Sequence, residues 1–407
     1  MSKPTTPIAI NKAIEEVLRR DRGRLMAGLT SRLRDIEVAE DALQEALISA
    51  MSHWGRSGLP NSPIGWLMKV ALNKGIDRAR AVKRENQKAD ELMLIKPTQI
   101  ETIDETPIPD DRLGLIFACC HPSLEEKTRV ALTLRTVCNL TTREIAAAFL
   151  DNDTAMGQRL SRAKSSLRSA GVSFEIPDRD IWPARLDAVL STIYLIFTTG
   201  YVNEDESDRD LCAEALFLLR LLDRLCPNDP EIEGALALVL LTDARRSARI
   251  GPDGASIAPQ DQDRSKWDSR MILEGQELLA LAMKRGRPGP FQIKAAIADC
   301  HMADPAPDWK QISFLFGSLW AHEPTPIVAL NWAIVMAELG EKELALSKIE
   351  ALEVELREFQ PFYAAYASLL SQLGQFEKAR AAYDTAIQLA QSVSSQKFLK
   401  NKRAQLS

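Results

Sequence analysis

The sequence predicts an all-α protein, and three observations lead to that prediction. Apolar residues recur at three- and four-residue spacing, as in Ile14, Val17 and Leu18, which is the pattern of amphipathic helices. Alternating runs rich in Val, Ile and Thr are almost absent, and no Asn-Gly or Gly-Gly hairpin signal occurs. Gly and Pro are not enriched, with 19 and 21 among 407 residues. This length predicts two or three helical domains.

The composition favours a cytoplasmic globular protein. Apolar residues make up 45% of the chain and charged residues 26%, which is an ordinary globular balance. No stretch of 18 apolar residues exists, so we expect no membrane partner, and Met1–Ile10 lacks the apolar core of a secretory signal. Six cysteines, two of them adjacent, do not resemble a disulfide framework. A reducing cytoplasm is therefore the expected compartment.

Charge is distributed unevenly along the chain. Residues 1–84 carry 15 Lys and Arg against 9 Asp and Glu, and residues 127–169 carry 8 against 3. The segment between them, residues 85–126, carries 3 basic against 10 acidic residues, and the part beyond residue 175 is also acidic. Two basic modules on either side of an acidic connector indicate a polyanion bound at two places. The alternative is that these charges only solvate helix faces.

The first basic module spans residues 10–84. Its predicted helices are Ile14–Leu29, Ile36–His53 and Ile64–Ala81. A loop, Gly55–Ser62, separates the last two, and Ser62 followed by Pro63 is a strong helix-start signal. A polar, proline-containing stretch, residues 85–109, then predicts an acidic flexible linker.

The second basic module spans residues 110–172 and has a helix-turn-helix pattern. A first helix is predicted over Ser123–Cys138, and Thr141 or Thr142 is expected to cap the next, Arg143–Phe149. A short polar break precedes a basic amphipathic helix, Thr154–Ser169. An apolar face that docks on the preceding helix leaves the basic face free for a DNA major groove.

The third module, residues 180–407, ends in an internal repeat. Leu339-Gly340 and Leu373-Gly374 lie 34 residues apart, and the same offset pairs Ala333 with Ala367 and Ala345 with Ala379. This period is typical of tetratricopeptide (TPR) helical repeats, and upstream helices such as Leu211–Leu225 and Ile232–Ala244 are expected to extend the stack. Arg249–Asp268 interrupts the periodicity as a long polar loop, which either braces the stack or binds a partner.

Several segments together resemble the two conserved regions of bacterial sigma factors. The first group is Asp41-Ala-Leu-Gln-Glu-Ala46, Trp54, Pro63-Ile-Gly-Trp-Leu67 and Asn73-Lys-Gly-Ile-Asp-Arg78, which resembles region 2. The second group is Leu140-Thr-Thr-Arg-Glu-Ile-Ala146 with Gln158-Arg-Leu-Ser-Arg-Ala-Lys164, which resembles region 4. The order and the linker are similar to the extracytoplasmic-function (ECF) group, and the TPR-like extension to one subgroup of it. Phe117–Pro122 and Asp261–Asp268 also look like that subgroup.

The resemblance implies a sigma factor that binds core RNA polymerase through its β′ clamp helices and β flap and directs transcription from promoter DNA. Asp41, Gln44 and Glu45 would then dock on the β′ clamp helices. Their spacing places them on one face of a helix, where an acidic cluster suits a basic partner. The alternative is an ordinary exposed acidic face. A metal site is disfavoured because no His lies at ligand spacing in that helix.

Promoter contacts follow from the same resemblance. For the −10 element, Arg56, Asn61, Ser62 and Trp66 would line a pocket for an unstacked base, and Lys69, Asn73, Lys74 and Arg78 would hold the strand and the upstream duplex. Core packing is the alternative for Trp66. For the −35 element, the candidates are Arg143, Thr154, Gln158, Arg159, Arg162 and Lys164. Gly157 departs from the family's frequent polar residue, which puts base contact there in doubt.

The remaining motifs favour structural roles. Cys119-Cys120-His121 and Cys300-His301 have poor spacing for zinc, and cysteine is commonly buried as a small hydrophobe. No phosphate-binding glycine loop and no catalytic triad pattern occurs, so we expect no enzyme activity, no cofactor and no metal. Two other functions stay open: a helix-turn-helix regulator with a TPR sensor that acts without polymerase, and a TPR scaffold. A protein partner of the TPR domain also stays open.

Overall fold

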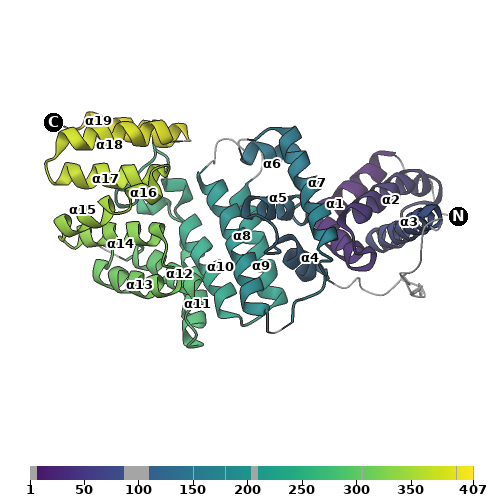
Figure 1. Ribbon diagram of the computed structural model, residues 1–407. Helices are drawn as coiled ribbons and strands as arrows, with labels where there is room; N and C mark the ends of the chain where they lie inside the picture. The colour runs from purple at the N-terminus through teal and green to yellow at the C-terminus, as the bar shows by residue number, and fades with distance from the viewer. Residues whose placement is uncertain are drawn as a thin grey trace. The chain divides into compact units, whose positions relative to one another are not determined.

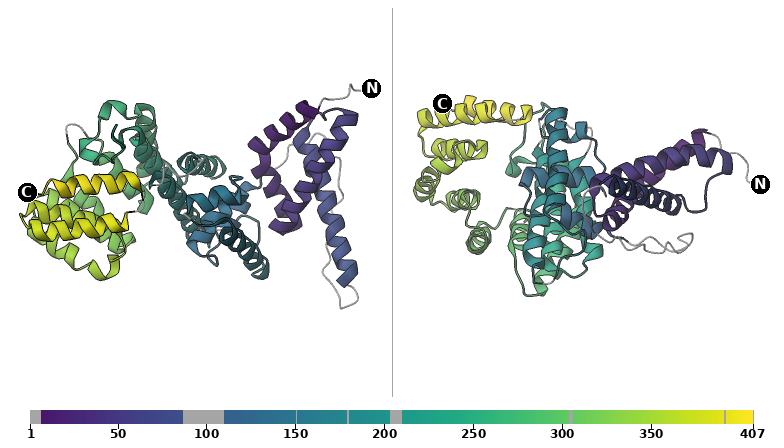
Figure 2. Two further views of the ribbon diagram at one scale, coloured as in Figure 1. Left: turned by 90° about the horizontal axis from the view of Figure 1, so that it is seen from above. Right: turned by 45° about the vertical axis from the view of Figure 1, so that its right-hand side comes forward.

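The computed structural model confirms the all-α prediction. It describes residues 7–86, 110–149, 151–178, 180–202, 210–303, 306–390 and 392–406. Within these ranges the regular elements are helices, apart from one isolated bridge between Ile250 and Ser256, and Figures 1 and 2 show coiled ribbons without arrows. No helix in the described ranges has the length and apolar character needed to cross a membrane. The chain divides into two compact units, with the boundary between Ile196 and Phe197.

The first unit begins with three helices that pack on one another. They are α1 (Pro7–Leu33), α2 (Ile36–Ser57) and α3 (Pro63–Asn86). Leu25, Leu29, Trp54 and Leu67 are fully buried between them. Since the predicted linker starts at residue 85, its first two residues belong to α3 instead, and residues 87–109 lie outside the described residues.

The corner between α2 and α3 corrects one prediction. The loop was expected to begin at Gly55, but α2 continues to Ser57, so Gly55 and Arg56 are helical. The helix ends at Gly58, whose φ of 85° suits glycine and whose N–H donates to the Trp54 carbonyl at 3.0 Å. Ser62 caps α3 as predicted, since its Oγ accepts from the Gly65 N–H at 3.2 Å.

The helix-turn-helix lies in the second half of the first unit. This half contains α4 (Arg112–Cys119), α5 (Glu126–Thr136), α6 (Thr142–Ala148) and α7 (Asp153–Ser169), and α6 and α7 form the helix-turn-helix itself. The periodicity did not predict α4, and α5 is shorter than Ser123–Cys138. Thr141 is the cap of α6: its Oγ1 accepts from the Glu144 N–H at 3.1 Å, and the Glu144 carboxylate accepts from the Thr141 N–H at 2.6 Å.

Helix α8 (Trp182–Val202) contains the boundary between the units, and its first part belongs to the first unit. The Arg185 guanidinium donates to the Phe117 carbonyl of α4 at 2.6 Å, and the Trp182 ring lies 5.0 Å from the Phe117 ring between centroids. Phe117, the first residue of the motif Phe117–Pro122, is therefore part of the surface on which α8 packs.

The second unit continues as a succession of helices. They are α9 (Leu211–Leu225), α10 (Pro230–Asp243), α11 (Ser269–Lys284), α12 (Pro290–Cys300), α13 (Trp309–His322), α14 (Pro326–Glu338), α15 (Lys342–Glu350), α16 (Glu353–Leu356), α17 (Gln360–Gln372), α18 (Phe376–Leu389) and α19 (Val393–Ala404). Figure 1 shows α17 and α18 side by side, as their many contacts require.

The 34-residue repeat corresponds to the helix pairs α14–α15 and α17–α18. Gly340 and Gly374 occupy equivalent turns with φ of 95° and 73°, a conformation that L side chains rarely adopt. The paired alanines, Ala333 with Ala367 and Ala345 with Ala379, are all buried at the helix crossings. The repeated helix pair at the end of the chain thus follows from the sequence period.

The long polar loop makes many contacts inside the second unit. It contains short 3-10 turns at Pro259–Asp261 and Arg264–Lys266, and a third, Arg246–Ala248, directly precedes it. Arg246 in that preceding turn pairs with Asp210, and the guanidinium of Arg249 in the loop lies 3.6 Å from the centroid of the Tyr201 ring. These contacts support the bracing role that the sequence left open.

Candidate polymerase and DNA interface

The predicted polymerase-binding residues share one face of α2. Gln44 and Glu45 are exposed, and Asp41 is half-exposed. The same face continues toward the end of the helix with Ile48 and Met51, which are 68% and 55% exposed. These two residues were not among the predicted site residues. Ile48 lies four residues after Gln44 and Met51 lies seven after it, so helical spacing places both apolar side chains on an otherwise acidic surface. Such a surface combines charge with apolar area, which suits a protein partner.

Ion pairs connect this acidic face to the predicted DNA-binding helix. Arg78 of α3 lies 2.7 Å from Asp41, and Lys74 lies 3.9 Å from Glu45. The four side chains are 38–51% exposed. Exposed ion pairs contribute only about 0–1 kcal/mol to the stability of a fold. These pairs can therefore break at low cost, which leaves each cation available to DNA and each carboxylate available to a protein.

Three aromatic rings pack together at the corner of α2 and α3. Trp54 is fully buried, and the half-buried Trp66 ring meets it edge-on, with centroids 5.4 Å apart and an interplanar angle of 66°. The exposed His53 ring then stacks on Trp66 at 5.5 Å and 22°. Trp66 therefore packs on the core on one side and supports an exposed ring on the other. The sequence analysis missed His53 because a single histidine near a helix end carries no periodic signal.

The remaining −10 candidates surround this corner. Arg56 lies in the last turn of α2, where its Nε donates to the Ser52 carbonyl at 3.2 Å. Asn61 is exposed, and the Ser62 hydroxyl oxygen is already engaged as the cap of α3. Asn73 is exposed and Lys69 half-buried on α3.

The exposed face of α7 brings together part of the −35 set. Thr154, Gln158 and Arg162 follow each other at four-residue spacing and are all exposed. Arg143 is exposed at the start of α6. The other two candidates lie at opposite edges of this face: Arg159 pairs with Asp151 at 3.2 Å, and Lys164 pairs with Glu40 of α2.

The adjacent cysteines are inaccessible. Cys119 and Cys120 are fully buried, and burial raises the pKa of both thiols well above their ordinary value. A thiol that resists ionisation is a poor nucleophile and a poor metal ligand. Across the described part of the chain, no group of three or more His, Cys, Asp or Glu residues could hold a metal ion.

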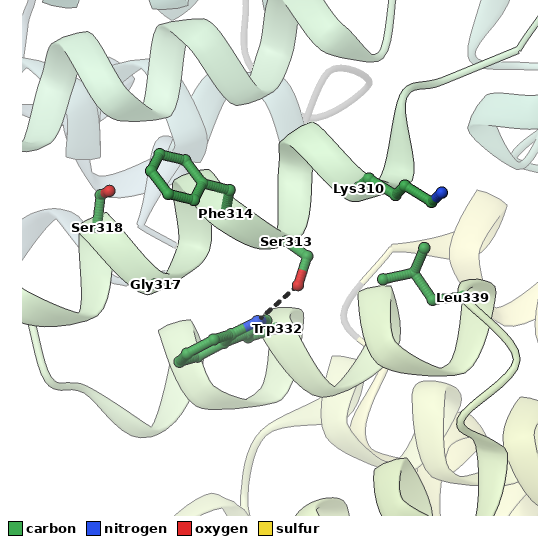
Figure 3. A pocket seen from close by; sticks show the side chains of 7 residues that line it. All are labelled: Lys310, Ser313, Phe314, Gly317, Ser318, Trp332 and Leu339. Carbon is green, nitrogen blue, oxygen red and sulfur yellow. Dashed lines mark hydrogen bonds between the residues drawn. The ribbon is translucent and has the colours of Figure 1, made fainter.

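A shallow apolar pocket lies between α13 and α14 in the second unit. Figure 3 shows the residues that line it: Lys310, Ser313, Phe314, Gly317, Ser318, Trp332 and Leu339. The Trp332 Nε1 donates to the Ser313 Oγ at 3.1 Å, which fixes the ring along one wall, and Phe314 is 72% exposed.

Comparison with known proteins agrees with this arrangement. The model of sigma-70 region 2 matches residues 17–85, that of sigma-70 region 4 matches residues 115–167, and a family of unknown function (DUF6596) matches residues 185–283. An uncharacterized protein of Rhizobium meliloti (strain 1021) is 39% identical over 390 residues, which cover 93% of this chain and 92% of that relative. No solved structure matches the chain. The chain belongs to the sigma-70 family of bacterial sigma factors, with regions 2 and 4 followed by a helical C-terminal extension.

Proposed function

We propose that this sigma factor is of the ECF type and that regions 2 and 4 alone carry its promoter recognition, with the C-terminal extension supporting region 4. Sigma factors are non-enzymatic initiation factors that bind core RNA polymerase and promoter DNA, so the chain is not an enzyme. The observation that carries the proposal is the combination, in one chain, of an acidic and partly apolar face on α2 with a separate exposed polar face on α7. Such a protein acts with polymerase in the cytoplasm.

In this proposal α2 docks on the β′ clamp helices through Asp41, Gln44 and Glu45, and region 4 binds the β flap. The corner of α2 and α3 takes the −10 element, and α7 enters the major groove of the −35 element. Supporting this, the acidic residues of α2 and the cations of α3 lie close enough to pair, so polymerase and the −10 DNA would be held at neighbouring surfaces.

The test is reconstitution with core polymerase and a promoter library, with the bound −35 and −10 sequences as the readout. The chain is expected to compete for core enzyme and to direct initiation from a shared pair of elements. A helix-turn-helix regulator without a polymerase role would instead bind duplex operators equally well with and without core enzyme. A TPR scaffold would do neither.

A supporting role for the extension rests on α8. This helix contributes Trp182 and Arg185 to the packing around α4, which precedes the helix-turn-helix. An extension that only inhibited region 4 would not need to form part of its fold. The pocket with Trp332 and Phe314 is the surface of the repeats best suited to a protein partner, since it combines exposed aromatics with hydrogen-bonding groups.

Arg162→Ala is expected to weaken binding of holoenzyme to its best promoter by about 1–3 kcal/mol and to relax the −35 preference. Arg162 is exposed at the centre of the α7 face, and its Nε contact to the Gln158 carbonyl lies within the same helix, so the fold should tolerate the change. The measurement is promoter affinity over a set of −35 variants. Arg20→Ala, an exposed cation on α1, is the charge-matched control. Equal weakening on every promoter would make Arg162 a phosphate contact instead.

His53→Ala is expected to weaken binding of the single-stranded −10 element by about 1–3 kcal/mol, the contribution of one stacked base. The exposed imidazole lies at the end of the ring stack formed with Trp66 and Trp54, so a captured base would extend that stack. The measurement is fluorescence quenching of 2-aminopurine placed along the −10 strand, and His53→Phe is expected to restore the quenching that His53→Ala loses. If His53→Ala leaves the quenching unchanged and lowers the melting temperature of the protein, His53 only covers Trp66 and does not bind a base.

A further inference from the structure

Two adjacent arginines just after α10 have opposite surroundings. The Arg246 guanidinium donates to both carboxylate oxygens of Asp243, at 2.7 and 2.8 Å, and to Asp210 at 2.7 Å. Arg245 is half-buried, and its Nε atom is inaccessible to solvent and has no hydrogen-bond partner. Arg246 thus engages two carboxylates, whereas Arg245 engages none in the described part of the chain.

The groups around Arg245 do not balance its charge. Burial lowers the pKa of Arg245, Tyr201 opposes this effect, and the positive charge of Arg249 adds to it. Burial also raises the pKa of Tyr201, so its hydroxyl group stays neutral and supplies no counter-charge. Arg249 lies over the Tyr201 ring and donates to the Tyr201 carbonyl. Among the described residues, Arg245 therefore has a second cation as its neighbour and no anion.

The far end of the long polar loop supplies another N–H donor without a partner. The Asp268 N–H donates to the Ala244 carbonyl at 2.8 Å, which joins the two ends of the loop. The Trp267 Nε1 atom is inaccessible to solvent and has no hydrogen-bond partner. Arg245 and Trp267 each stand one residue from the bond between Ala244 and Asp268. Two unpartnered side-chain donors are therefore located at the base of this loop.

His301, which follows α12, lies close enough to be affected by the charge of Arg245. Burial first, and the charge of Arg245 second, lower the pKa of His301 to about 4. The His301 ring meets the Trp309 ring edge-on, with centroids 5.4 Å apart. At neutral pH the imidazole is therefore uncharged, and it neither compensates Arg245 nor adds a further cation.

Unpartnered donors of this kind are costly to keep in a fold. Nearly all buried polar groups in proteins have a hydrogen-bond partner, and a buried charge without a counter-ion is the most unfavourable case. An arginine that only filled space here could be replaced by an apolar side chain without loss. A ligand that brings negative charge and acceptor atoms would satisfy both Arg245 and Trp267.

These donors select a small oxyanion. A guanidinium presents its N–H groups as a planar fork that matches two oxygens of a carboxylate or phosphate group, and an indole N–H can only donate. Arg264 adds positive charge beside the same ring, since its guanidinium carbon lies 5.1 Å from the Trp267 centroid and the residue is exposed. A cation would meet only repulsion from these groups.

We propose that the base of the long polar loop is a binding site for a small oxyanion, a carboxylate or a phosphate group, held by the Arg245 guanidinium and the Trp267 indole N–H. The site lies within the second unit and does not depend on promoter recognition by regions 2 and 4. The loop also reaches α19, where the Ser256 N–H donates to the Ser394 carbonyl at 3.2 Å. An anion that joins the ends of the loop should therefore stabilise the extension.

The test compares the full-length chain with Arg245→Met, which keeps a long aliphatic side chain but loses the charge and the donors. Arg270→Met, at an exposed position just after the loop, is the charge-matched control. Thermal unfolding is followed with increasing inorganic phosphate or acetate at constant ionic strength. At about ten times the dissociation constant, the natural chain and the control should gain about 3–5 °C. The Arg245→Met variant should gain less than about 1 °C.

Unfolding without oxyanions tests whether Arg245 lacks a partner in the free chain. Removing an unpaired buried charge relieves a desolvation penalty, so Arg245→Met should unfold at the same temperature as the natural chain or at a higher one. A decrease of about 5 °C or more would show that contacts within the chain already satisfy Arg245. That result would overturn the proposal.

Titration calorimetry then distinguishes the two kinds of oxyanion. Tighter binding of phosphate assigns a phosphate group to the site, and tighter binding of acetate assigns a carboxylate. Either result supports the site if Arg245→Met weakens binding about 10- to 100-fold and Trp267→Phe, which keeps an aromatic ring, weakens it about 3- to 10-fold. Equal stabilisation of the natural chain and Arg245→Met would be a general salt effect and would overturn the proposal. The absence of binding by both anions would overturn it as well.

Discussion

Asp41→Asn together with Glu45→Gln is expected to weaken the binding of core polymerase by about 100-fold. Each substitution removes a charge while keeping the shape of the side chain on the α2 face. Hydrogen bonds to charged groups contribute about 1.5–3 kcal/mol each, so losing two such contacts at an interface costs about 3 kcal/mol or more. The measurement is competition with a labelled sigma factor for core enzyme.

The fold should be insensitive to the same substitutions. The pairs with Arg78 and Lys74 are exposed, so their loss should change the free energy of unfolding by less than about 1 kcal/mol each. Glu15→Gln with Glu16→Gln changes the net charge equally on α1 and should leave polymerase binding intact. If both double variants bind core enzyme as the natural chain does, the α2 face is an ordinary solvated surface.

Local signals account for what the sequence predicted correctly. The start of α3 follows from Ser62 and Pro63, because a side-chain cap and a pre-set φ act within four residues. The repeat at the end of the chain follows from a fixed period and two turn glycines, Gly340 and Gly374. Of the −35 candidates, Thr154, Gln158 and Arg162 share the exposed face that helical spacing predicts.

What the sequence missed depends on contacts between distant segments. Helix α4 is short and almost entirely buried, so it carries no amphipathic period, and the surface on which α8 packs cannot be recognised from residues 112–119 alone. Lys164 looked like a free DNA contact because its partner Glu40 lies 124 residues away. The end of α2 was placed too early because Gly55 resembles a helix stop, whereas the glycine with positive φ is Gly58.

Ending the chain after Asp178 is expected to unfold the helix-turn-helix, although that cut lies outside region 4. The truncation removes all of α8, including its first part, Trp182–Ile196, which belongs to the first unit. Leu186, Val189, Leu190 and Ile193 are buried there, and each such side chain contributes about 1.5–3 kcal/mol. The loss of several such contributions is comparable with the whole free energy of unfolding of a domain. The measurement is thermal unfolding together with transcription from a promoter that requires its −35 element.

A matched pair of chains separates packing from regulation. A chain that ends after Val202 keeps α8 on α4 and is expected to retain a cooperative unfolding transition for the first unit. In the full chain, Arg185→Ala should lower the free energy of unfolding by about 1.5–3 kcal/mol, because it removes the charged donor to the Phe117 carbonyl. Arg357→Ala, a 73% exposed cation of the second unit, should change neither stability nor transcription. If the chain ending after Asp178 has the same thermal unfolding transition and the same transcription activity as the full-length protein, α8 only connects the two units. If it instead transcribes more strongly, the extension restrains region 4 rather than supporting it, because a helix that only buttressed the fold could not raise activity by its absence.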